Sequence, residues 1–428
     1  MRKRISIIGA AGKMTSVAAR ALLKRFPEAT FALSDFNYSA LQAIYGKMEG
    51  PRVRLLSVDI FQPDQLSELV GGSDLVINGA GPFYKTTAVV ANACIAAGVD
   101  YLDIGDDIES TQDAIQLDQA AKRAGVALYI GCGASPGMTN LLAADLISRL
   151  DVVDSVEVAW VVGDEGPQDV GRAVVEHVIH IGAGDCLTWR NGKPFVSRSF
   201  VASTVLPLGG ALGNYRLYEC AHPETVTLPF SFTHIKNAWC WGGLHPQPAN
   251  GLIMGVARAY RNGHITLDQA CDFMTAVMAE KSGSGKVWRY AVSGMLGQVL
   301  RGENSMGNVF NFIRMALKKQ HPPMLSGIMA RAKGMSGDKS LTLSRSVPGV
   351  PGGVLSGSMA NATGLPQAAF SSIVLQQKEK RTGTLFPEKI ASLDAVKDEL
   401  VAMGVDRSEV ESPLLQTDAR GESIDSPA

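Results

Sequence analysis

A run of small residues from Gly9 to Thr15 lies between a β-branched segment and a segment with helical character, and its chemistry is that of a phosphate-binding turn. Glycine and alanine let the backbone turn tightly and approach a ligand closely, because no bulky side chain intervenes. A helix expected over 16–26 would direct its free N–H groups and positive dipole end at an anion. The residues predicted to contact that anion are Gly9, Ala11, Gly12, Lys13 and Met14.

An acid stands where a dinucleotide site needs one. Asp35 directly follows a predicted strand over 30–34, so its carboxylate can accept hydrogen bonds from the hydroxyls of an adenosine ribose. The same charge repels a 2′-phosphate, and no arginine follows it at once. The sequence therefore favours NAD as the cofactor, with NADP possible. An ordinary strand–helix–strand unit with a tight turn and no ligand is the alternative.

Strands and helices continue to alternate after Asp35. Strands are predicted over 4–8, 53–58, 75–78, 101–103 and 127–130, with helices over 86–97 and 112–124 between them. This order is typical of an α/β fold with a Rossmann-type, doubly wound parallel sheet. Ligands of such sheets bind beyond the carboxyl ends of the strands, which makes Asp59, after the third strand, a further candidate cofactor contact.

Two small-residue loops follow later strands and are predicted to reach the nicotinamide half of the cofactor. The first comes after the fourth strand, and the second comes after the sixth and ends in residues that suit a helix N-terminus near Leu141. Both permit close approach of backbone to a ligand. The predicted cofactor contacts in these loops are Asn78, Gly79, Ala80, Gly81, Pro82, Cys132, Gly133, Ala134 and Pro136.

With both loops in view, the chain resembles the saccharopine dehydrogenase family, including its saccharopine reductase-like and lysine 6-dehydrogenase-like members. The resemblance covers about residues 1–230 and 360–405, and none is found between about 268 and 350. The matching segments are 9–14, 78–83, 96–103, 133–142, 189–192, 222–224, 227–229, 363–366 and 383–388.

The resemblance implies a Rossmann domain that the chain leaves near residue 135 and rejoins through a C-terminal helix, with an inserted α+β domain for substrate binding and dimerisation. The expected division is a dinucleotide-binding domain over 1–135, a substrate and dimerisation domain over 136–355 built around an antiparallel sheet, a returning helical segment over 356–410 and a disordered tail over 411–428. Within the insertion, 268–334 has helical periodicity, whereas 336–357 is rich in Gly, Pro and Ser and is predicted as a loop. The periodic residues Phe310, Phe312, Ile313, Met315 and Leu317 are predicted as core.

The family implies hydride exchange between NAD(P) and an amine carbon, so the chain needs a base and a group that binds a carboxylate. Asp103 and Asp106 after the fifth strand, or His177 or His180 from the second domain, are the candidate bases. Arg172, Arg190 or Arg216 could clamp a carboxylate through a planar guanidinium fork. Each histidine and arginine has a purely structural role as its alternative. Further candidate substrate contacts are Phe83, Tyr84, Ser135 and Thr139.

Composition excludes several functional classes. Forty Lys plus Arg balance forty-one Asp plus Glu, which argues against a dedicated nucleic-acid or anionic-membrane partner. The six cysteines lack C-x-x-C spacing, so neither a metal site nor a disulfide framework is predicted, and the cytoplasm is the expected compartment. We therefore expect a homodimeric, NAD(P)-dependent oxidoreductase that acts on a C–N bond of an amino acid, an opine-like conjugate or a carboxylated polyamine. An enoyl or carbonyl reductase and a non-catalytic NAD(H) sensor are the alternatives.

Overall fold

The computed structural model describes residues 3–163, 171–279, 281, 283–320 and 324–418, which form two compact units. Unit 1 comprises Met1–Asp145, Val226–Thr233 and Ser358–Val410, and unit 2 comprises Leu146–Thr225, His234–Gly357 and Glu411–Ala428. The chain thus leaves unit 1 ten residues later than the position 135 implied by the resemblance. It returns to unit 1 near the expected residue, and the short segment 226–233 joins unit 1 in addition.

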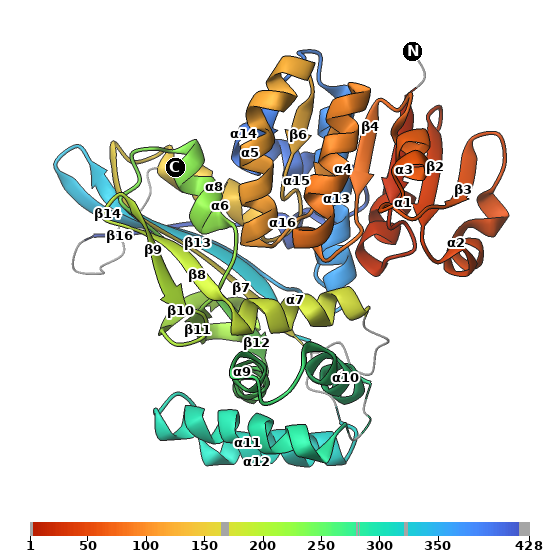
Figure 1. Ribbon diagram of the computed structural model, residues 1–428. Helices are drawn as coiled ribbons and strands as arrows, with labels where there is room; N and C mark the ends of the chain where they lie inside the picture. Colours follow the sequence, from red (N-terminus) through yellow and green to blue (C-terminus); the bar gives the residue numbers. More distant parts are fainter. Residues whose placement is uncertain (1–2, 164–170, 280, 282, 321–323, 419–428) are drawn as a thin grey trace. The chain divides into compact units, whose positions relative to one another are not determined.

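A seven-stranded parallel sheet forms the centre of unit 1 (Figure 1), which confirms the predicted Rossmann-type fold. The strand order is β15-β6-β5-β4-β1-β2-β3, so the order reverses beside β1. The strand β15, which extends the sheet beyond β6, was not predicted. The strands are β1 (Arg4–Ile8), β2 (Thr30–Asp35), β3 (Val53–Ser57), β4 (Leu75–Asn78), β5 (Asp100–Asp103), β6 (Ala127–Tyr129) and β15 (Gly383–Leu385).

Helices cover the sheet of unit 1. The returning helix α13 packs directly on α1, and the approach is close because a Cβ atom at Gly364 would lie 2.3 Å from the backbone oxygen of Met14. The C-terminal segment therefore completes the layer that presents the glycine-rich turn. The helices are α1 (Lys13–Arg25), α2 (Tyr38–Tyr45), the 3₁₀ helix η1 (Gly46–Met48), α3 (Pro63–Val70), α4 (Phe83–Ala97), α5 (Ile108–Ala124), α6 (Met138–Ile147), α8 (Glu224–Ser231), α13 (Met359–Gln376), α14 (Pro387–Ile390), α15 (Leu393–Ala402) and α16 (Arg407–Val410).

A nine-stranded mixed sheet forms the frame of unit 2. Its central pair, β7 and β12, is parallel, whereas the other pairs are antiparallel, so the expectation of an antiparallel sheet is correct except at its centre. The strands are β7 (Val152–Gly163), β8 (Asp185–Arg190), β9 (Lys193–Arg198), β10 (Ser203–Gly209), β11 (Gly213–Glu219), β12 (Asn237–His245), β13 (Gly327–Ser336), β14 (Lys339–Pro348) and β16 (Leu414–Asp418), with the 3₁₀ helix η2 (Gly210–Leu212) before β11.

Three sequence predictions are wrong in this sheet. Helical periodicity was predicted over 268–334, whereas its end belongs to the strand β13. The segment 336–357 is not a plain loop, because 339–348 forms β14, whose alternating side chains pair with β13. The tail is not disordered throughout, since 414–418 pairs with β14 as β16, while 419–428 lies outside the described residues. The strand β14 forms a hairpin with β13 through the two-residue turn at 337–338, so the Gly, Pro and Ser content of 336–357 concealed a strand. The strand β16 pairs with a strand about 70 residues away, and local composition carries no signal of such pairing.

Five helices complete unit 2. Four of them, α7 (Arg172–Ala183), α9 (Pro248–Arg261), α10 (Leu267–Met278) and α11 (Gly285–Leu300), enclose a common apolar core, and α12 (Met306–Leu317) contacts α9 and α11. The predicted core positions on α12 are partly wrong: Phe310 is 70% exposed and Leu317 is 82% exposed, and Val309 is the buried residue of this helix. The periodicity of the sequence correctly identified an apolar face on α12, but it could not show whether other residues cover that face.

No helix among the described residues combines the length and the apolar character needed to cross a membrane.

Candidate functional site

The glycine-rich turn of unit 1 has the geometry that anion binding needs. Gly9 has a φ of 70°, and a Cβ atom there would lie 2.8 Å from the backbone nitrogen of Ala80, so only glycine fits this position. Gly12 is the N-cap of α1 and supplies no capping side chain. Residue 12 therefore makes no side-chain capping hydrogen bond at the N-terminus of α1, as in phosphate-binding turns.

Thr15 occupies the position at which the usual dinucleotide fingerprint has a third glycine. It is buried, and a Cβ atom at Gly79 would lie 1.8 Å from the Thr15 Oγ1 atom. The absence of a side chain at Gly79 therefore makes room for Thr15. The loops after β1 and β4 pack against each other through this contact, which explains how the turn accommodates a threonine at this position.

Asp35 lies beside the glycine-rich turn, as predicted for a ribose-binding acid. Its Oδ2 atom accepts a hydrogen bond from the Ala11 N–H (3.1 Å), and its Oδ1 atom accepts one from the Asn37 N–H (2.9 Å). Asp59, at the end of the neighbouring strand, accepts the Phe61 N–H (3.0 Å), so its carboxylate also shapes its own loop.

Two exposed aromatic residues at the same edge were missed by the sequence analysis. Phe36 follows β2 and is 79% exposed, and Phe61 follows the adjacent strand β3 and is 57% exposed. Large apolar side chains at such exposure lose favourable burial, so their position calls for a reason. The sequence contained a signal that could have identified both residues: each lies one or two positions after the acid at the carboxyl end of its strand.

Asp103 is fully buried, and each of its two carboxylate oxygens accepts two hydrogen bonds. Its Oδ2 atom accepts the Tyr101 hydroxyl (2.8 Å) and the Thr87 hydroxyl (3.1 Å), while its Oδ1 atom accepts the N–H groups of Gly131 (2.8 Å) and Gly105 (3.1 Å). Burial raises the pKa of Asp103, and these hydrogen bonds oppose the rise. The carboxylate has no open face toward a substrate, so the structure corrects the prediction of a base: Asp103 positions the loops after β5 and β6.

The loop after β4 is held by the same network. The Asn78 Nδ2 atom donates to the Tyr101 hydroxyl (3.1 Å), and its Oδ1 atom accepts the Ala80 N–H (3.1 Å). The peptide bond between Gly81 and Pro82 is cis, and α4 begins at the next residue. The loops after β4 and β6, which were predicted to meet a dinucleotide, and the loop after β5 are thus tied to one buried hydrogen-bond network.

The substrate contacts predicted in unit 1 lie at the starts of two helices. Phe83 is nearly buried at the start of α4, and the Tyr84 N–H donates to the Asp107 carboxylate (3.0 Å). Ser135 is half-buried, whereas Thr139 is fully buried and its N–H donates to the Ala134 oxygen (3.0 Å).

The loop after β6 is compact. The Cys132 N–H donates to the Asp103 backbone oxygen (2.8 Å), the Gly133 N–H donates to the Pro136 oxygen (3.1 Å), and the bond between Ser135 and Pro136 is cis. Burial raises the pKa of the Cys132 thiol well above its usual value. This thiol therefore remains protonated.

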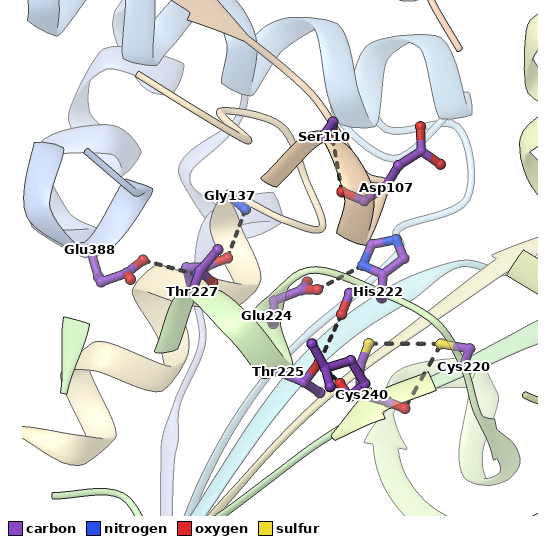
Figure 2. Close-up of polar contacts among 12 residues, drawn as sticks. Asp107, Ser110, Gly137, Cys220, His222, Glu224, Thr225, Thr227, Cys240 and Glu388 are labelled. Carbon is purple, nitrogen blue, oxygen red and sulfur yellow. Dashed lines mark hydrogen bonds and ion pairs between the residues drawn. The ribbon is translucent and has the colours of Figure 1, made fainter. Parts of the chain in front are cut away.

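A second polar cluster fixes the helix that follows this loop (Figure 2). The Asn140 Oδ1 atom accepts the Gly137 N–H (3.1 Å), and its Nδ2 atom donates to Thr227 Oγ1 (2.9 Å) and to the Glu388 carboxyl (2.9 Å). The Ser231 hydroxyl donates to the other Glu388 oxygen (2.5 Å). Burial raises the pKa of Glu388 to about 7, although the bonds from Ser231 and Asn140 oppose the rise. The family-like segments 133–142, 227–229 and 383–388 therefore meet in one cluster of unit 1.

Unit 2 contains a histidine–carboxylate pair that the sequence analysis noted only as a family-like segment. The His222 Nδ1 atom lies 2.6 Å from the Glu224 Oε2 atom (Figure 2), and both side chains are buried. Cys220 and Cys240 lie next to the pair in the fold, with their sulfur atoms 3.8 Å apart. Nothing in the spacing of these residues indicated that β11, β12 and the loop before α8 would bring them together.

The other predicted site residues of unit 2 are not all brought together. Arg172 is exposed and forms ion pairs with Asp268 and Asp272, so it lies on a solvated face. Arg216 donates to the Ser203 hydroxyl (3.1 Å). The imidazole ring of His177 lies 6.3 Å from that of His222, which places His177 beside the histidine–carboxylate pair. Asp106 belongs to unit 1, where it follows β5 and is half-buried.

Three features together define a Rossmann-type dinucleotide-binding unit. They are the parallel sheet with its strand-order reversal, the helix α1 that begins after a glycine turn, and the carboxylate of Asp35 at the end of β2. Comparison with known families gives a second, narrower result. Residues 5–128 match the family model described as "Saccharopine dehydrogenase NADP binding domain". The resemblance to the saccharopine dehydrogenase family is thereby confirmed over residues 5–128, which lie in unit 1.

Two known relatives match about a third of the chain. Carboxyaminopropylagmatine dehydrogenase of Synechocystis sp. is 31% identical over 167 residues, which cover 35% of this chain and 41% of that protein. Trans-acting enoyl reductase of Mycobacterium ulcerans is 26% identical over 133 residues, or 30% of this chain and 32% of that protein. The matches thus span less than half the length of either relative.

The fold of a solved structure is similar to this chain over nearly its whole length. Saccharopine dehydrogenase (L-Glu forming) from Saccharomyces cerevisiae matches with a TM-score of 0.61 at 13% identity, over 97% of this chain and 100% of that one. At this identity the match establishes the fold and says nothing of the substrate.

Proposed function

We propose that this chain is an NAD(P)-dependent oxidoreductase that acts on a C–N bond of an amino acid, an opine-like conjugate or a carboxylated polyamine, with NAD as the preferred cofactor. The observation that carries the proposal is the phosphate-binding turn with Asp35 beside it, within a stretch that matches a saccharopine dehydrogenase NADP-binding domain. A carboxylate in this position favours two free ribose hydroxyls over a 2′-phosphate.

The described residues fit a dinucleotide. The turn from Gly9 to Met14 would hold the pyrophosphate, Asp35 would bind the adenosine ribose, and Phe36 with Phe61 would cover the adenine ring. The loops after β4 and β6 would hold the nicotinamide half through backbone groups. When bound, the oxidised cofactor supplies the hydride acceptor for a carbon–nitrogen bond that becomes a C=N double bond.

Support for an amine substrate comes from one relative. The relative from Synechocystis sp. is named for a carboxyaminopropyl derivative of agmatine. This name describes a molecule with an amine nitrogen and a carboxylate. The similarity to a trans-acting enoyl reductase favours a second candidate, reduction of a C=C bond.

A substrate panel separates these candidates. Purified protein would be assayed with NAD and NADP against L-lysine, saccharopine, ornithine and carboxylated polyamines, and in the reverse direction with keto acid–amine pairs and enones, by the absorbance of reduced nicotinamide. Cofactor-dependent turnover of a carboxylated amine supports the proposal. Turnover of enones alone supports the enoyl reductase, and NADH binding without any turnover supports a sensor.

We also propose that the chain forms a homodimer through the apolar face of α11 and α12. Leu300, Phe310 and Leu317 are 88%, 70% and 82% exposed. Exposed large apolar side chains in contiguous helices are typical of an interface.

A further inference from the structure

Three side chains of different chemistry meet in the interior of unit 2. Donor atoms of His222, Glu224 and Cys240 all lie within 4.8 Å of one another. The side chains of His222 and Glu224 are 4% and 0% exposed, and Cys240 is fully buried. All three residues belong to unit 2. A nitrogen, a carboxylate oxygen and a sulfur atom enclosed together form a donor set for a transition metal rather than for Mg²⁺ or Ca²⁺, which prefer oxygen ligands.

The backbone brings the donors together through two neighbouring strands. Cys220 directly follows β11, and its N–H donates to the backbone oxygen of Cys240 in β12 (3.1 Å). His222 and Glu224 come next in the chain, and the Thr225 hydroxyl fixes their loop by donating to the backbone oxygen of His222 (3.0 Å). Because β12 lies between β11 and β7 in the sheet, Cys240 occupies a rigid position. Main-chain geometry therefore fixes where the three donors lie.

The separations are compatible with a tetrahedral zinc ion. Bonds of about 2.0 Å to nitrogen and oxygen and about 2.3 Å to sulfur place neighbouring ligands of such an ion about 3.3–3.6 Å apart. The His222 Nδ1 and Glu224 Oε2 atoms lie 2.6 Å apart, as befits two atoms that share a proton (Figure 2). A zinc ion in place of that proton would spread the pair by about 0.7 Å, which a rotation of the Glu224 carboxylate about its last torsion permits.

Cys220 contacts the site without being a ligand. Its Sγ atom lies 3.8 Å from the Cys240 Sγ atom and donates to it. Its sulfur does not belong to the group of mutually close donor atoms found among the described residues. A thiolate bound to a metal accepts hydrogen bonds from neighbouring donors, and such outer partners tune the affinity of the site. The Cys220 thiol occupies the position of such a partner.

We propose that His222, Glu224 and Cys240 bind one Zn²⁺ ion, with a water molecule as the fourth ligand, and that the ion links the loop after β11 to β12. On binding, the thiol proton of Cys240 and the proton shared by His222 and Glu224 leave to solvent. A thiolate and a carboxylate then balance the two charges of the ion, which avoids the cost of an uncompensated buried charge. The inference does not rest on the proposed function, since none of its residues is assigned to the dinucleotide.

Metal analysis of the full-length protein is the first test. Protein kept reduced, saturated with zinc chloride and freed of excess metal by gel filtration should retain one zinc ion per chain. Cobalt(II) in place of zinc should give the visible absorption of a tetrahedral ion and a near-ultraviolet charge-transfer band from the thiolate. A wild type that retains no zinc would overturn the proposal and leave His222 and Glu224 as a proton-sharing pair. A cobalt spectrum without the thiolate band would overturn it as well.

Variants assign the ligands. Cys240→Ala should abolish the thiolate band, whereas Cys271→Ala, which replaces an equally buried cysteine of unit 2 outside the cluster, should retain it. Cys220→Ala should keep the band and weaken zinc binding by about 10- to 100-fold, the usual effect of losing an outer partner. His222→Gln and Glu224→Gln should weaken it more, in competition with a chromogenic chelator. Glu224→Gln preserves the shape of the side chain and carries the test if Cys240→Ala does not fold.

Stability gives a readout that is independent of the spectra. A structural zinc site contributes its binding free energy to folding, so zinc should raise the Tm of the wild type and of Cys271→Ala but not that of Cys240→Ala. Zinc affinity or a Tm response that is the same in Cys240→Ala as in the wild type would overturn the assigned ligands. NADH titration of the chelator-treated protein tests the proposed function separately, so the failure of one proposal is distinguishable from the failure of the other.

Discussion

Replacing Glu388 with glutamine should remove a distinct pH dependence from the stability of unit 1. The Glu388 carboxyl accepts hydrogen bonds from Ser231 and Asn140, and burial raises its pKa from 4.5 to about 7. Between these two values the folded protein retains a proton that the unfolded chain releases. Stability therefore falls as pH rises through this window and reaches its lower plateau above the folded pKa.

The magnitude follows from the shift. Each tenfold change in proton affinity is worth about 1.4 kcal/mol, so the rise from 4.5 to about 7 destabilises the folded state by about 3 kcal/mol above pH 7, relative to pH 4. Glutamine has the shape of the protonated acid and can keep both hydrogen bonds, with its oxygen toward Asn140 and its amide toward Ser231. Glu388→Gln should thus match the wild type near pH 4 and exceed its stability by about 3 kcal/mol at pH 8.

The assay is urea unfolding of the wild type and Glu388→Gln from pH 4 to pH 8. The difference between their free energies of unfolding removes the contributions of the groups that titrate in the same way in both proteins. Glu399→Gln is the matched control. Burial works to raise the pKa of Glu399, but the hydrogen bonds from Arg25 and Ser372 outweigh it and the pKa is lowered. This variant should lose stability at neutral pH, and the loss should shrink as the pH falls toward the folded pKa. A pH-independent difference for Glu388→Gln, or one of opposite sign, would refute the assigned protonation.

Four further predictions concern the proposed cofactor site, the loops beside it and the proposed dimer interface. Asp35→Arg should shift the ratio of NAD to NADP affinity toward NADP by about 10- to 100-fold, from the loss of charged hydrogen bonds, and an unchanged ratio in calorimetric titrations would mean that the carboxylate does not contact the ribose. Phe36→Ala should weaken NADH binding by about 1 kcal/mol through lost stacking on adenine, with the exposed Phe195→Ala in unit 2 as the neutral control. Asp103→Ala should lower stability by about 2–4 kcal/mol, because it leaves buried donors of two loops unpaired, and a smaller loss in urea unfolding would argue against its positioning role. Phe310→Ser should shift light-scattering mass from dimer toward monomer, whereas a monomeric wild type would rule out the proposed interface.

The sequence predicted the parallel sheet of unit 1 well, because its signals are local. Each strand is a short apolar run bounded by small residues, and each helix has one apolar face, so β1 and β4 match the predicted residues. The sequence could not predict β15 or β16, which are short and gain stability only from partners far away in the chain. The exposed face of α12 was mistaken for core for a related reason, since periodicity shows that a helix has an apolar side but not what lies against it.

The candidate site divides in the same way. The turn at Gly9, Asp35 and the two small-residue loops were predictable, because backbone geometry and chain order dictate their chemistry. The roles of Asp103 and His222 were not, since each depends on which side chains surround it. Asp103 follows a strand like a catalytic acid, yet four donors enclose it, and His222 acquires its partner from a turn whose shape no spacing rule describes.

Titration calorimetry of NADH into the folded, purified protein tests the central claim that unit 1 holds a pyridine dinucleotide. The account predicts one binding site per chain, with NADH bound more tightly than NADPH and the preference reduced or reversed in Asp35→Arg. Absence of binding by NADH, NAD, NADPH and NADP to protein whose circular dichroism shows a native α/β fold would contradict it.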